Sequence, residues 1–382
     1  MLFFDNNLYK VKTLNSNMQK IAIIGAGVFG CSAAIELGKD FEVVLFERDN
    51  NILCGASTVN HLRHHYGFHY PRSKETVEEI KKARESFERE YGECVSEFFD
   101  DYYGVSKTGS KTTPEDFIKF CDNLNLPYKI EWPEEKYLDK EKIGICVKTP
   151  ERVYDPDILK GLILKKLRNL RVTLMLNSQI IGGRTEGNKK KIKIKIGKKE
   201  FEEEFDYVIN ATYSNFNNFN KWFGFPRKTF LYELMELIEL YIPNQKKIGL
   251  TIMDGAFSAL LPRGDKGTFT LGHVDASVLK KVVSDDIDPV VMANENIESN
   301  KEEILKRGIE DFPFLKNAEF VKSLFVTRVV KANVDATDER PSEITDYGNG
   351  MYSIFGGKII TCIDIAKKLA GMIRKNISKT ND

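Results

Sequence analysis

The sequence predicts an α/β fold built around a Rossmann-like dinucleotide-binding unit, and three observations support this prediction. First, the apolar residues 21–24 are followed by a glycine-rich turn at residues 25–30 and then by a segment of helical composition. Second, residues 41–46 have the composition of a buried parallel strand, which completes a βαβ unit of about 30 residues. Third, residues 230–275 hold alternating stretches and turns, which are typical of a largely antiparallel sheet.

The remaining elements follow from periodicity and from the signals at their ends. Helices are expected at residues 73–100, 114–124, 155–167, 295–308 and 359–376, the third with Pro156 in its first turn. Strands are expected at residues 171–176, 206–212 and 351–355. Residues 1–17 are expected to form a loose N-terminal extension, and Met18 is an alternative start.

Residues 189–205 form a lysine-rich segment with two possible interpretations. The segment alternates Lys with Ile and then Glu with Phe, around a turn at residues 197–199. This alternation predicts a β-hairpin with one solvated face. A nucleic-acid patch is the weaker interpretation, because the glutamates of the second half balance the lysines.

The composition limits the class of protein. The formal net charge is +1, from 57 basic and 56 acidic residues, so nothing in the overall balance indicates a nucleic-acid partner. The six cysteines form no Cys-x-x-Cys pair, which favours reduced thiols in a cytoplasmic protein over a disulfide framework or a zinc site. No stretch approaches the roughly 18 apolar residues of a transmembrane helix, and residues 2–4 are too short an apolar run for a signal peptide.

The glycine turn at residues 25–30 matches the pattern G-x-G-x-x-G in the context that dinucleotide binding requires. In that pattern Gly25 permits the tight turn, Gly27 lets the backbone approach a pyrophosphate, and Gly30 lets helix and strand pack closely. The free N–H groups at the start of the helix favour the phosphates. Glu47 follows 22 positions after Gly25, where an acid accepts hydrogen bonds from a ribose diol; its alternative is a surface residue at a strand end.

The glycine pattern alone does not distinguish NAD from FAD. Two later segments, residues 208–212 and 356–358, are expected to contact the same cofactor. The second again places two glycines before a helix. A cofactor contacted by early, middle and late segments is more readily an extended FAD than a nicotinamide nucleotide.

These segments resemble those of the D-amino-acid oxidase-like (DAO) superfamily of FAD-dependent oxidoreductases. The superfamily includes glycine and sarcosine oxidases, 2-hydroxyglutarate oxidases and FAD-linked glycerol-3-phosphate dehydrogenases. The matching stretches are residues 21–49, 55–57, 206–212 and 356–361. Residues 60–72 and 254–262 are similar to segments of a less characterised branch of this superfamily, for which no substrate is settled.

The resemblance implies a discontinuous Rossmann-like FAD-binding domain and a substrate domain with a mixed or antiparallel sheet. We assign residues 18–75, 150–215 and 325–382 to the FAD domain, and residues 76–149 and 216–324 to the substrate domain. The residues expected to bind FAD are Gly25, Ala26, Gly27, Val28, Phe29, Gly30, Glu47, Arg48, Ser57, Ile180, Ala211, Thr212, Gly356, Gly357, Lys358 and Ile359.

Lys358 has two interpretations. At the start of a helix behind two glycines, it could place positive charge near the flavin pyrimidine ring and stabilise the reduced anionic ring. The alternative is a solvated lysine on a helix surface.

Four of the five histidines lie within residues 61–69, in the segment that the resemblance places beside the flavin. A metal site is the weaker interpretation, because no carboxylate or thiolate partner stands at workable spacing. We expect His65 and His69 to accept the substrate proton, since histidine suits that role near neutral pH. The blander alternative is a polar loop whose histidines bond to backbone groups.

Two arginines are candidates for binding an anionic substrate group. Arg63 lies in the histidine segment, and Arg328 follows the strand-like residues 325–327. For Arg328 a structural ion pair with a nearby acid is the alternative.

The function expected is oxidation of a CH–OH or CH–NH group of a small, polar, anionic substrate by hydride transfer to FAD. Two alternatives remain: a flavin-binding protein without redox turnover, and an NAD-dependent oxidoreductase. A covalent flavin link through His61, His65 or Cys362 is a further possibility. The apolar strands at residues 230–262 could pair between subunits of a homo-oligomer.

Overall fold

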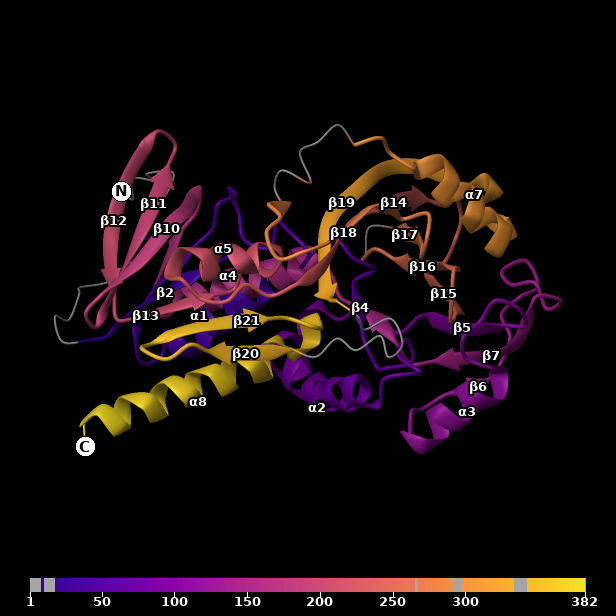
Figure 1. Ribbon diagram of the computed structural model, residues 1–382. Coiled ribbons are helices and arrows are strands. Elements are labelled where there is room, and N and C mark those ends of the chain that lie inside the picture. Colours follow the sequence, from indigo (N-terminus) through magenta and orange to yellow (C-terminus); the bar gives the residue numbers. More distant parts are fainter. Residues whose placement is uncertain are drawn as a thin grey trace, which may run out of the picture. The chain divides into compact units, whose positions relative to one another are not determined.

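The structure is a computed structural model that describes residues 8–9, 18–264, 267–289, 292, 297–332 and 342–381. The chain forms two compact units, each assembled from separate stretches (Figure 1). One unit, here named the dinucleotide unit, comprises residues 1–57, 160–229 and 341–382. The other, named the sheet unit, comprises residues 58–159 and 230–340. The division of the chain into FAD and substrate domains at the bounds given above stays a prediction.

The dinucleotide unit is built on a seven-stranded sheet in the order β1-β9-β3-β2-β13-β21-β20. Its strands are β1 (Leu8–Tyr9), β2 (Lys20–Ile24), β3 (Glu42–Phe46), β9 (Val172–Met175), β13 (Tyr207–Asn210), β20 (Glu343–Asp346) and β21 (Met351–Phe355). Neighbours from β9 to β21 run parallel, whereas the edge strands β1 and β20 pair antiparallel. Because β3 and β13 flank β2, the strand order reverses at β2. In such sheets ligands bind at the carboxyl ends of the strands beside this switch point.

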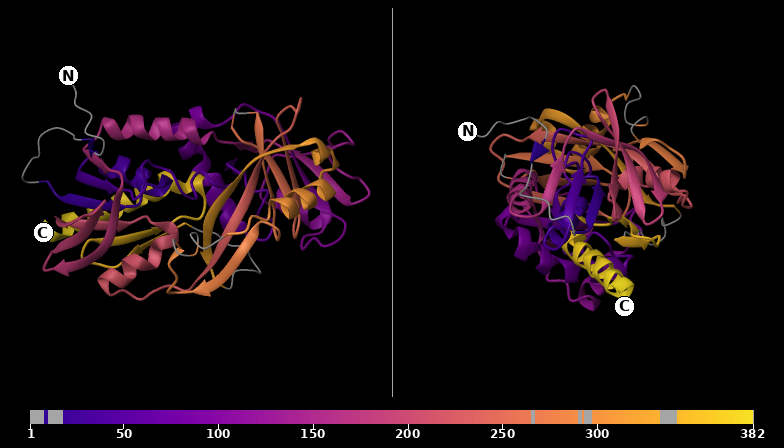
Figure 2. Two further views of the ribbon diagram at one scale, coloured as in Figure 1. Left: turned by 90° about the horizontal axis from the view of Figure 1, so that it is seen from above. Right: turned by 90° about the vertical axis from the view of Figure 1, so that its left-hand side faces the viewer.

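Helices and short 3-10 turns complete the dinucleotide unit. They are α1 (Val28–Leu37), α4 (Pro156–Arg168), α5 (Phe216–Phe223), α8 (Cys362–Asn381), η2 (Tyr213–Asn215) and η4 (Ile359–Thr361); α4 begins in the sequence range of the sheet unit. α8, yellow in Figure 2, packs against α1, whose side chains at Cys31, Ala33 and Ala34 are small and buried.

A separate three-stranded antiparallel sheet belongs to the same unit and contains the predicted hairpin (Figure 1). Its strands are β10 (Ser178–Glu186), β11 (Lys189–Ile196) and β12 (Lys199–Phe205). Ile192 and Ile194 are fully buried, while Lys193 on the alternate face forms an ion pair of 2.7 Å with Glu200. The hairpin prediction is therefore confirmed, and its lysines pair with acids rather than forming a uniform basic surface.

The sheet unit contains a nine-stranded mixed sheet and a two-stranded one. The nine strands are β5 (Asp100–Ser106), β6 (Lys129–Ile130), β7 (Ile143–Thr149), β14 (Phe230–Tyr241), β15 (Ile248–Met253), β16 (Ser258–Pro262), β17 (Thr268–His273), β18 (Val278–Ser284) and β19 (Glu319–Lys331); β4 (Arg63–His64) pairs with β8 (Arg152–Val153). All pairs in the large sheet are antiparallel except β15 with β5, so the expectation of a largely antiparallel sheet is confirmed.

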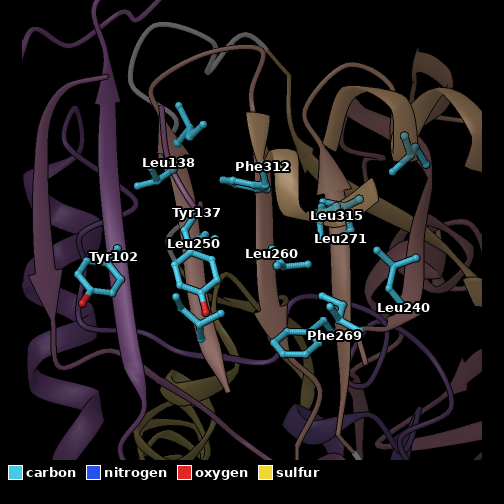
Figure 3. Packing of buried hydrophobic residues seen from close by; sticks show 14 of the residues in the cluster. Tyr102, Tyr137, Leu138, Leu240, Leu250, Leu260, Phe269, Leu271, Phe312 and Leu315 are labelled. Carbon is cyan, nitrogen blue, oxygen red and sulfur yellow. The ribbon is translucent and has the colours of Figure 1, made fainter. Parts of the chain in front are cut away.

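The remaining elements of the sheet unit are α2 (Lys74–Tyr91), η1 (Gly92–Cys94), α3 (Pro114–Asn123), α7 (Lys301–Asp311) and η3 (Pro313–Asn317). Leu250, Leu260, Phe269 and Leu271 project from the large sheet into its hydrophobic core, where residues from the α7–η3 segment join them (Figure 3). This core gives the sheet rigid support for the polar side chains described below.

Three of the expected elements differ in extent from those observed. The helix expected at residues 73–100 ends at Tyr91, because Val95 bridges to Tyr154 and β5 begins at Asp100. In the predicted extension, residues 8–9 form a strand against β9.

The other two differences concern helix starts. The helix expected from residue 295 begins at Lys301, and the buried carboxylate of Glu236 accepts the N–H of the N-cap residue Asn300 at 2.6 Å. The first two residues of that expected helix, 295–296, lie outside the described residues. The C-terminal helix begins at Cys362, after the turn η4.

Candidate functional site

The glycine turn of the dinucleotide unit lies directly after β2, at the switch point of the sheet. Gly25 has φ +100°, and a Cβ there would stand 2.7 Å from the carbonyl oxygen of Ala211. A Cβ on Gly30 would stand 1.9 Å from the oxygen of Gly25, so helix and turn are in direct backbone contact. At Gly27 the nearest atom is Ser57 Oγ at 3.5 Å, which is ordinary contact. The first and third glycines are thus required by the fold, whereas the second keeps a surface open.

The N-terminus of α1 has the chemistry of an anion site. Its N-cap residue, Gly27, provides no side-chain cap, and the first turn carries no acidic residue. The N–H of Val28 donates to Ser57 Oγ at 3.0 Å. Free N–H groups and the positive end of the helix dipole favour a phosphate at this position.

Glu47 follows the last residue of β3, next to this turn. Its carboxylate accepts the N–H of Ala26 at 2.8 Å and the N–H of Asp49 at 3.0 Å. Burial raises the pKa of Glu47, and these backbone hydrogen bonds partly oppose the shift. A carboxylate fixed in this way beside a glycine turn fits a ribose diol.

The late glycine segment lies against the first turn of α1. A Cβ on Gly356 would stand 2.1 Å from Cε2 of Phe29, so the aromatic ring lies directly on this glycine. The N–H of Gly357 donates to Ser342 Oγ at 3.0 Å, and Thr361 donates to the carbonyl of Lys358 at 2.7 Å. Residues far apart in the sequence therefore meet at one edge of the sheet.

The structure places the other expected FAD residues in three different settings. Ala211 contacts the turn, and the N–H of Thr212 bonds to the side chain of Asn210. Arg48 is exposed, and Ile180 is buried in an apolar cluster that includes Phe46. The arrangement as a whole fits a dinucleotide; the FAD contact of each residue stays a prediction.

In the sheet unit, Arg63 lies at the centre of a buried polar cluster. Its guanidinium donates to Tyr103 Oη at 2.7 Å, to Glu151 Oε1 at 2.9 Å and to Thr251 Oγ1 at 2.6 Å. The residue is 5% exposed. These partners come from β5, from the segment after β7 and from β15, so Arg63 ties the histidine segment to the large sheet.

The cluster contains a second acid, so its carboxyl groups outnumber its one guanidinium. Asp101 is fully buried and accepts a hydrogen bond from Thr149 Oγ1 at 2.6 Å. Burial, and to a lesser extent the nearby charge of Glu151, raises the pKa of Asp101 from 3.8 to about 7. Arg63 opposes this shift. The cluster thus holds two carboxyl groups around one guanidinium, which favours a proton on Asp101.

The four clustered histidines occupy two kinds of environment. His61 contacts Thr270 Oγ1 at 3.1 Å, and His64 is fully buried between the rings of Tyr66 and Phe87. Burial lowers the pKa of both to about 3, and neighbouring arginines add to the shift. His65 and His69 are only partly buried.

Two further contacts concern the partly buried histidines. Nδ1 of His65 lies 3.9 Å from Glu151 Oε2, and both His65 and His69 pack on the ring of Tyr70. The fifth histidine, His273, accepts the N–H groups of Asp275 and Ala276 on Nδ1 and so closes a turn.

An ion pair joins the two segments that the resemblance singled out. Arg72 Nε donates to Asp254 Oδ2 at 2.8 Å, and Thr112 Oγ1 donates to the same oxygen at 2.8 Å. The histidine segment and the segment at residues 254–262 are therefore held together within the sheet unit.

Arg328 forms a structural ion pair, which was the alternative interpretation of this residue. Its guanidinium donates to the buried Glu233 at 2.7 Å through Nε and lies 2.5 Å from it through NH2. The arginine side chain is 34% exposed, whereas that of Arg63 is 4% exposed. A role of either arginine in substrate binding stays a prediction.

Sequence reasoning missed three members of the buried cluster: Tyr103, Glu151 and Asp101. None lies in a motif, and each stands in a strand or turn that reads as ordinary sheet. One feature of the sequence could have indicated them: the mostly buried strand at residues 100–106 begins with two acidic residues.

Two further findings hold for the part of the chain that the structure describes. Within it, no group of three or more histidine, cysteine or acidic side chains could hold a metal ion. Within it, too, no helix is long and apolar enough to cross a membrane.

Comparison with known proteins gives matches along most of the chain. The family described as FAD dependent oxidoreductase (DAO) matches residues 20–323. The FAD-dependent monooxygenase kojA of Aspergillus flavus is 25% identical, over 93% of this chain and 85% of the fungal protein. The FAD-dependent monooxygenase FPY4 of Fusarium mangiferae is 23% identical, over 94% of this chain and 92% of its own.

Solved structures share the fold. The L-α-glycerophosphate oxidase of Mycoplasma pneumoniae with FAD bound superposes with a TM-score of 0.72 at 14% identity, covering 91% of this chain and 93% of that one. Glycine oxidase from Geobacillus kaustophilus gives a TM-score of 0.69 at 15% identity, covering 94% and 95%.

Proposed function

The chain belongs to the DAO family of FAD-dependent oxidoreductases, and on that premise we propose that it oxidises a CH–OH or CH–NH group of a small, polar, anionic substrate. The family membership sets FAD as the cofactor, so the nicotinamide alternative and the alternative without redox turnover are dropped. In the proposed reaction a C=O or C=N bond would form as the substrate C–H bond breaks, a protein base would take the O–H or N–H proton, and bound FAD would serve as the acceptor of the hydride equivalent. FAD supplies the redox chemistry.

The free thiols of all six cysteines support a cytoplasmic location.

The chain's own part in holding FAD is assigned to the edge of the dinucleotide sheet. The N–H groups at the start of α1 would bind the pyrophosphate, and Glu47 would accept the ribose hydroxyls. Gly27 would leave the backbone accessible to the phosphates, since its nearest side-chain neighbour is only in ordinary contact.

We assign the proton acceptor to His65, with His69 as its neighbour. The observation that supports this choice is the division among the four clustered histidines. His61 and His64 have pKa values lowered to about 3 by burial, which makes them poor bases. His65, in contrast, lies beside the carboxylate of Glu151, which favours its protonated form.

The anionic group of the substrate is assigned to Arg328 in preference to Arg63. Arg63 donates hydrogen bonds to the buried groups of Tyr103, Glu151 and Thr251, and its side chain is almost inaccessible. Arg328 is one-third exposed on β19 and could bind an anion while it keeps Glu233. Lys358 would add positive charge near the reduced flavin.

The test is an anaerobic screen in which small hydroxy acids and amino acids are added to the holoenzyme. We expect at least one of them to bleach the long-wavelength flavin absorption, and the matching neutral amide or ester to bleach it much more slowly. With that substrate, His65→Asn should lower the rate of flavin reduction about 100-fold at unchanged FAD content. His273→Asn is the matched control, because an asparagine oxygen can accept the same turn hydrogen bonds, and it should reduce at the wild-type rate.

A different result would overturn these assignments. If His65→Asn and the wild type bleach at the same rate, His65 is not the proton acceptor. If the neutral amide and the acid bleach equally fast, no cation recognises the substrate charge.

A second candidate is monooxygenation, and the names of the two fungal relatives favour it. In that case an external reductant would reduce the flavin, molecular oxygen would be consumed and one of its atoms would enter the product. Turnover under ¹⁸O₂ separates the two candidates. Label in the product supports the monooxygenase, whereas unlabelled product supports the oxidation proposed here.

A further inference from the structure

We propose that Glu151 is a positioning residue that holds His65 in place and makes it the stronger base of the histidine segment. The inference rests on the proposed role of His65 as proton acceptor. Glu151 itself lies in no recognised motif, in the turn between β7 and β8.

Glu151 contacts residues that precede and follow His65 in the sequence. Its carboxylate is 1% exposed. One oxygen, Oε1, accepts Arg63 at 2.9 Å and Tyr103 Oη at 2.6 Å. The other, Oε2, accepts the backbone N–H of Tyr66 at 2.8 Å. Arg63 and Tyr66 flank residues 64–65, so this one carboxylate binds a side chain before His65 and the backbone directly after it.

The same oxygen faces the imidazole. Oε2 lies 3.9 Å from His65 Nδ1, which is too long for a hydrogen bond but short for two groups that are both mostly buried. At such a separation a carboxylate stabilises an imidazolium, because water screens the interaction only weakly. The Glu151 charge therefore increases the proton affinity of His65.

Other charged and titratable groups around Glu151 modify this effect without cancelling it. Arg63 neutralises part of the Glu151 charge, and its third hydrogen bond goes to Thr251. Tyr103 donates a hydrogen bond to Glu151 and remains protonated, because burial raises its pKa. Asp101 is the second acid of the cluster and is neutral below about pH 7.

His65 and Glu151 together thus explain the order of basicity in the segment. Burial and then neighbouring arginines disfavour the protonated forms of His61 and His64, although Glu88 Oε1 lies 3.4 Å from His64 Nε2. His65 faces the acid that neutralises the arginine of the same cluster. Among these three histidines, His65 is therefore the one whose protonated form Glu151 supports.

The test is a pH titration of the histidines by NMR in the holoenzyme labelled with ¹³C at histidine Cε1. The chain has only five histidines, so the signals are few, and His65→Gln assigns the relevant one. In Glu151→Gln, which keeps size and most hydrogen bonds, we expect the titration midpoint of His65 to fall by about one pH unit. In Tyr103→Phe, which removes a donor that shields the carboxylate, we expect the midpoint to rise slightly.

FAD content and melting temperature identify any variant that has failed to fold. If Glu151→Gln fails in this way, the shift of the His65 midpoint in Tyr103→Phe decides the test alone. Opposite shifts in the two variants support the inference, since a merely structural role of Glu151 would not produce them. An unchanged His65 midpoint in Glu151→Gln, or a fall in Tyr103→Phe, overturns it. This readout needs no substrate, so it can fail while the proposed function stands. The proposed function fails separately if His65→Asn reduces flavin at the wild-type rate.

Discussion

The two units of the chain build their polar sites in opposite ways. In the dinucleotide unit the site is mostly backbone: one turn of six residues and the start of α1, with Glu47 fixed by two N–H groups. In the sheet unit the cluster is made of side chains from separate strands, joined through Arg63 and Glu151. The first kind of site depends on the absence of side chains, and the second on the balance of charge among them.

This difference predicts different failures. Adding a single methyl group should damage the first site, because backbone atoms already fill the space. The second should tolerate small changes of volume but not the loss of one charge, because the remaining partner is buried without compensation. Single substitutions in each unit can separate these two kinds of failure.

Gly30→Ala should have the largest effect. Its Cβ would stand 1.9 Å from the backbone oxygen of Gly25, so the turn and α1 cannot keep their present contact. We expect little folded protein and no bound FAD, measured by soluble yield and flavin absorbance. Gly27→Ala is the matched control, since its Cβ meets only Ser57 Oγ at an ordinary distance. It should melt like the wild-type apoprotein yet bind FAD about tenfold or more weakly. Equal melting temperatures for both variants would contradict the contrast.

Arg63→Met should be the most damaging charge deletion. It leaves Glu151 and Asp101 buried without a cation, which should lower the free energy of unfolding by about 3–5 kcal/mol in denaturant titration. Arg328→Met removes an arginine from an ion pair at a partly exposed position and should cost about 1 kcal/mol or less. A loss for Arg63→Met as small as that for Arg328→Met would show that the cluster does not depend on its charge balance.

Glu47→Gln should weaken FAD binding without unfolding the unit. The amide oxygen can still accept one N–H, but the charged acceptor for the ribose is lost, which should lower FAD affinity about tenfold. Fluorescence titration of the apoprotein with FAD measures this. Glu42→Gln, at the other end of β3, is the control and should bind like the wild type. Equal affinities for both variants would remove Glu47 from the FAD site.

Asp101→Asn should change the pH dependence of stability. The pKa of Asp101 is raised from 3.8 to about 7, so the folded protein holds this proton more tightly than the unfolded chain does. Wild-type stability therefore falls through this window as pH rises, and the asparagine variant lacks that loss. Relative to the wild type, the variant should gain about 1–3 kcal/mol between about pH 4 and pH 8, measured by denaturant titration at each pH. A difference that is flat across this range would mean that Asp101 is already ionised.

The same contrast explains what the sequence could and could not predict. The βαβ unit, its glycine turn and the position of Glu47 follow from a contiguous motif, because local backbone geometry determines them. The histidine segment was predicted as one functional stretch, yet its members differ: His64 is fully buried, the other three keep some exposed surface, and burial lowers the pKa of His61 as well as that of His64. That division depends on neighbours such as Thr270 and Glu151, which are brought close only by sheet pairing.

The errors in helix bounds have the same origin. The segment at residues 92–100 has helical periodicity, but Val95 pairs with Tyr154 and Asp100 starts a central strand. At the start of α7 the N-cap residue Asn300 likewise bonds to a residue far away in the sequence, Glu236, 64 positions earlier. Tertiary pairing overrides local propensity at these positions.

Anaerobic reduction of the holoenzyme, followed by flavin absorbance with and without reduced nicotinamide nucleotide, is the decisive test of the proposed oxidation. We expect a small hydroxy or amino acid alone to bleach the flavin, without any need for added nicotinamide nucleotide. Bleaching by the nicotinamide nucleotide alone, with no response to any hydroxy or amino acid, would contradict it and favour the monooxygenase.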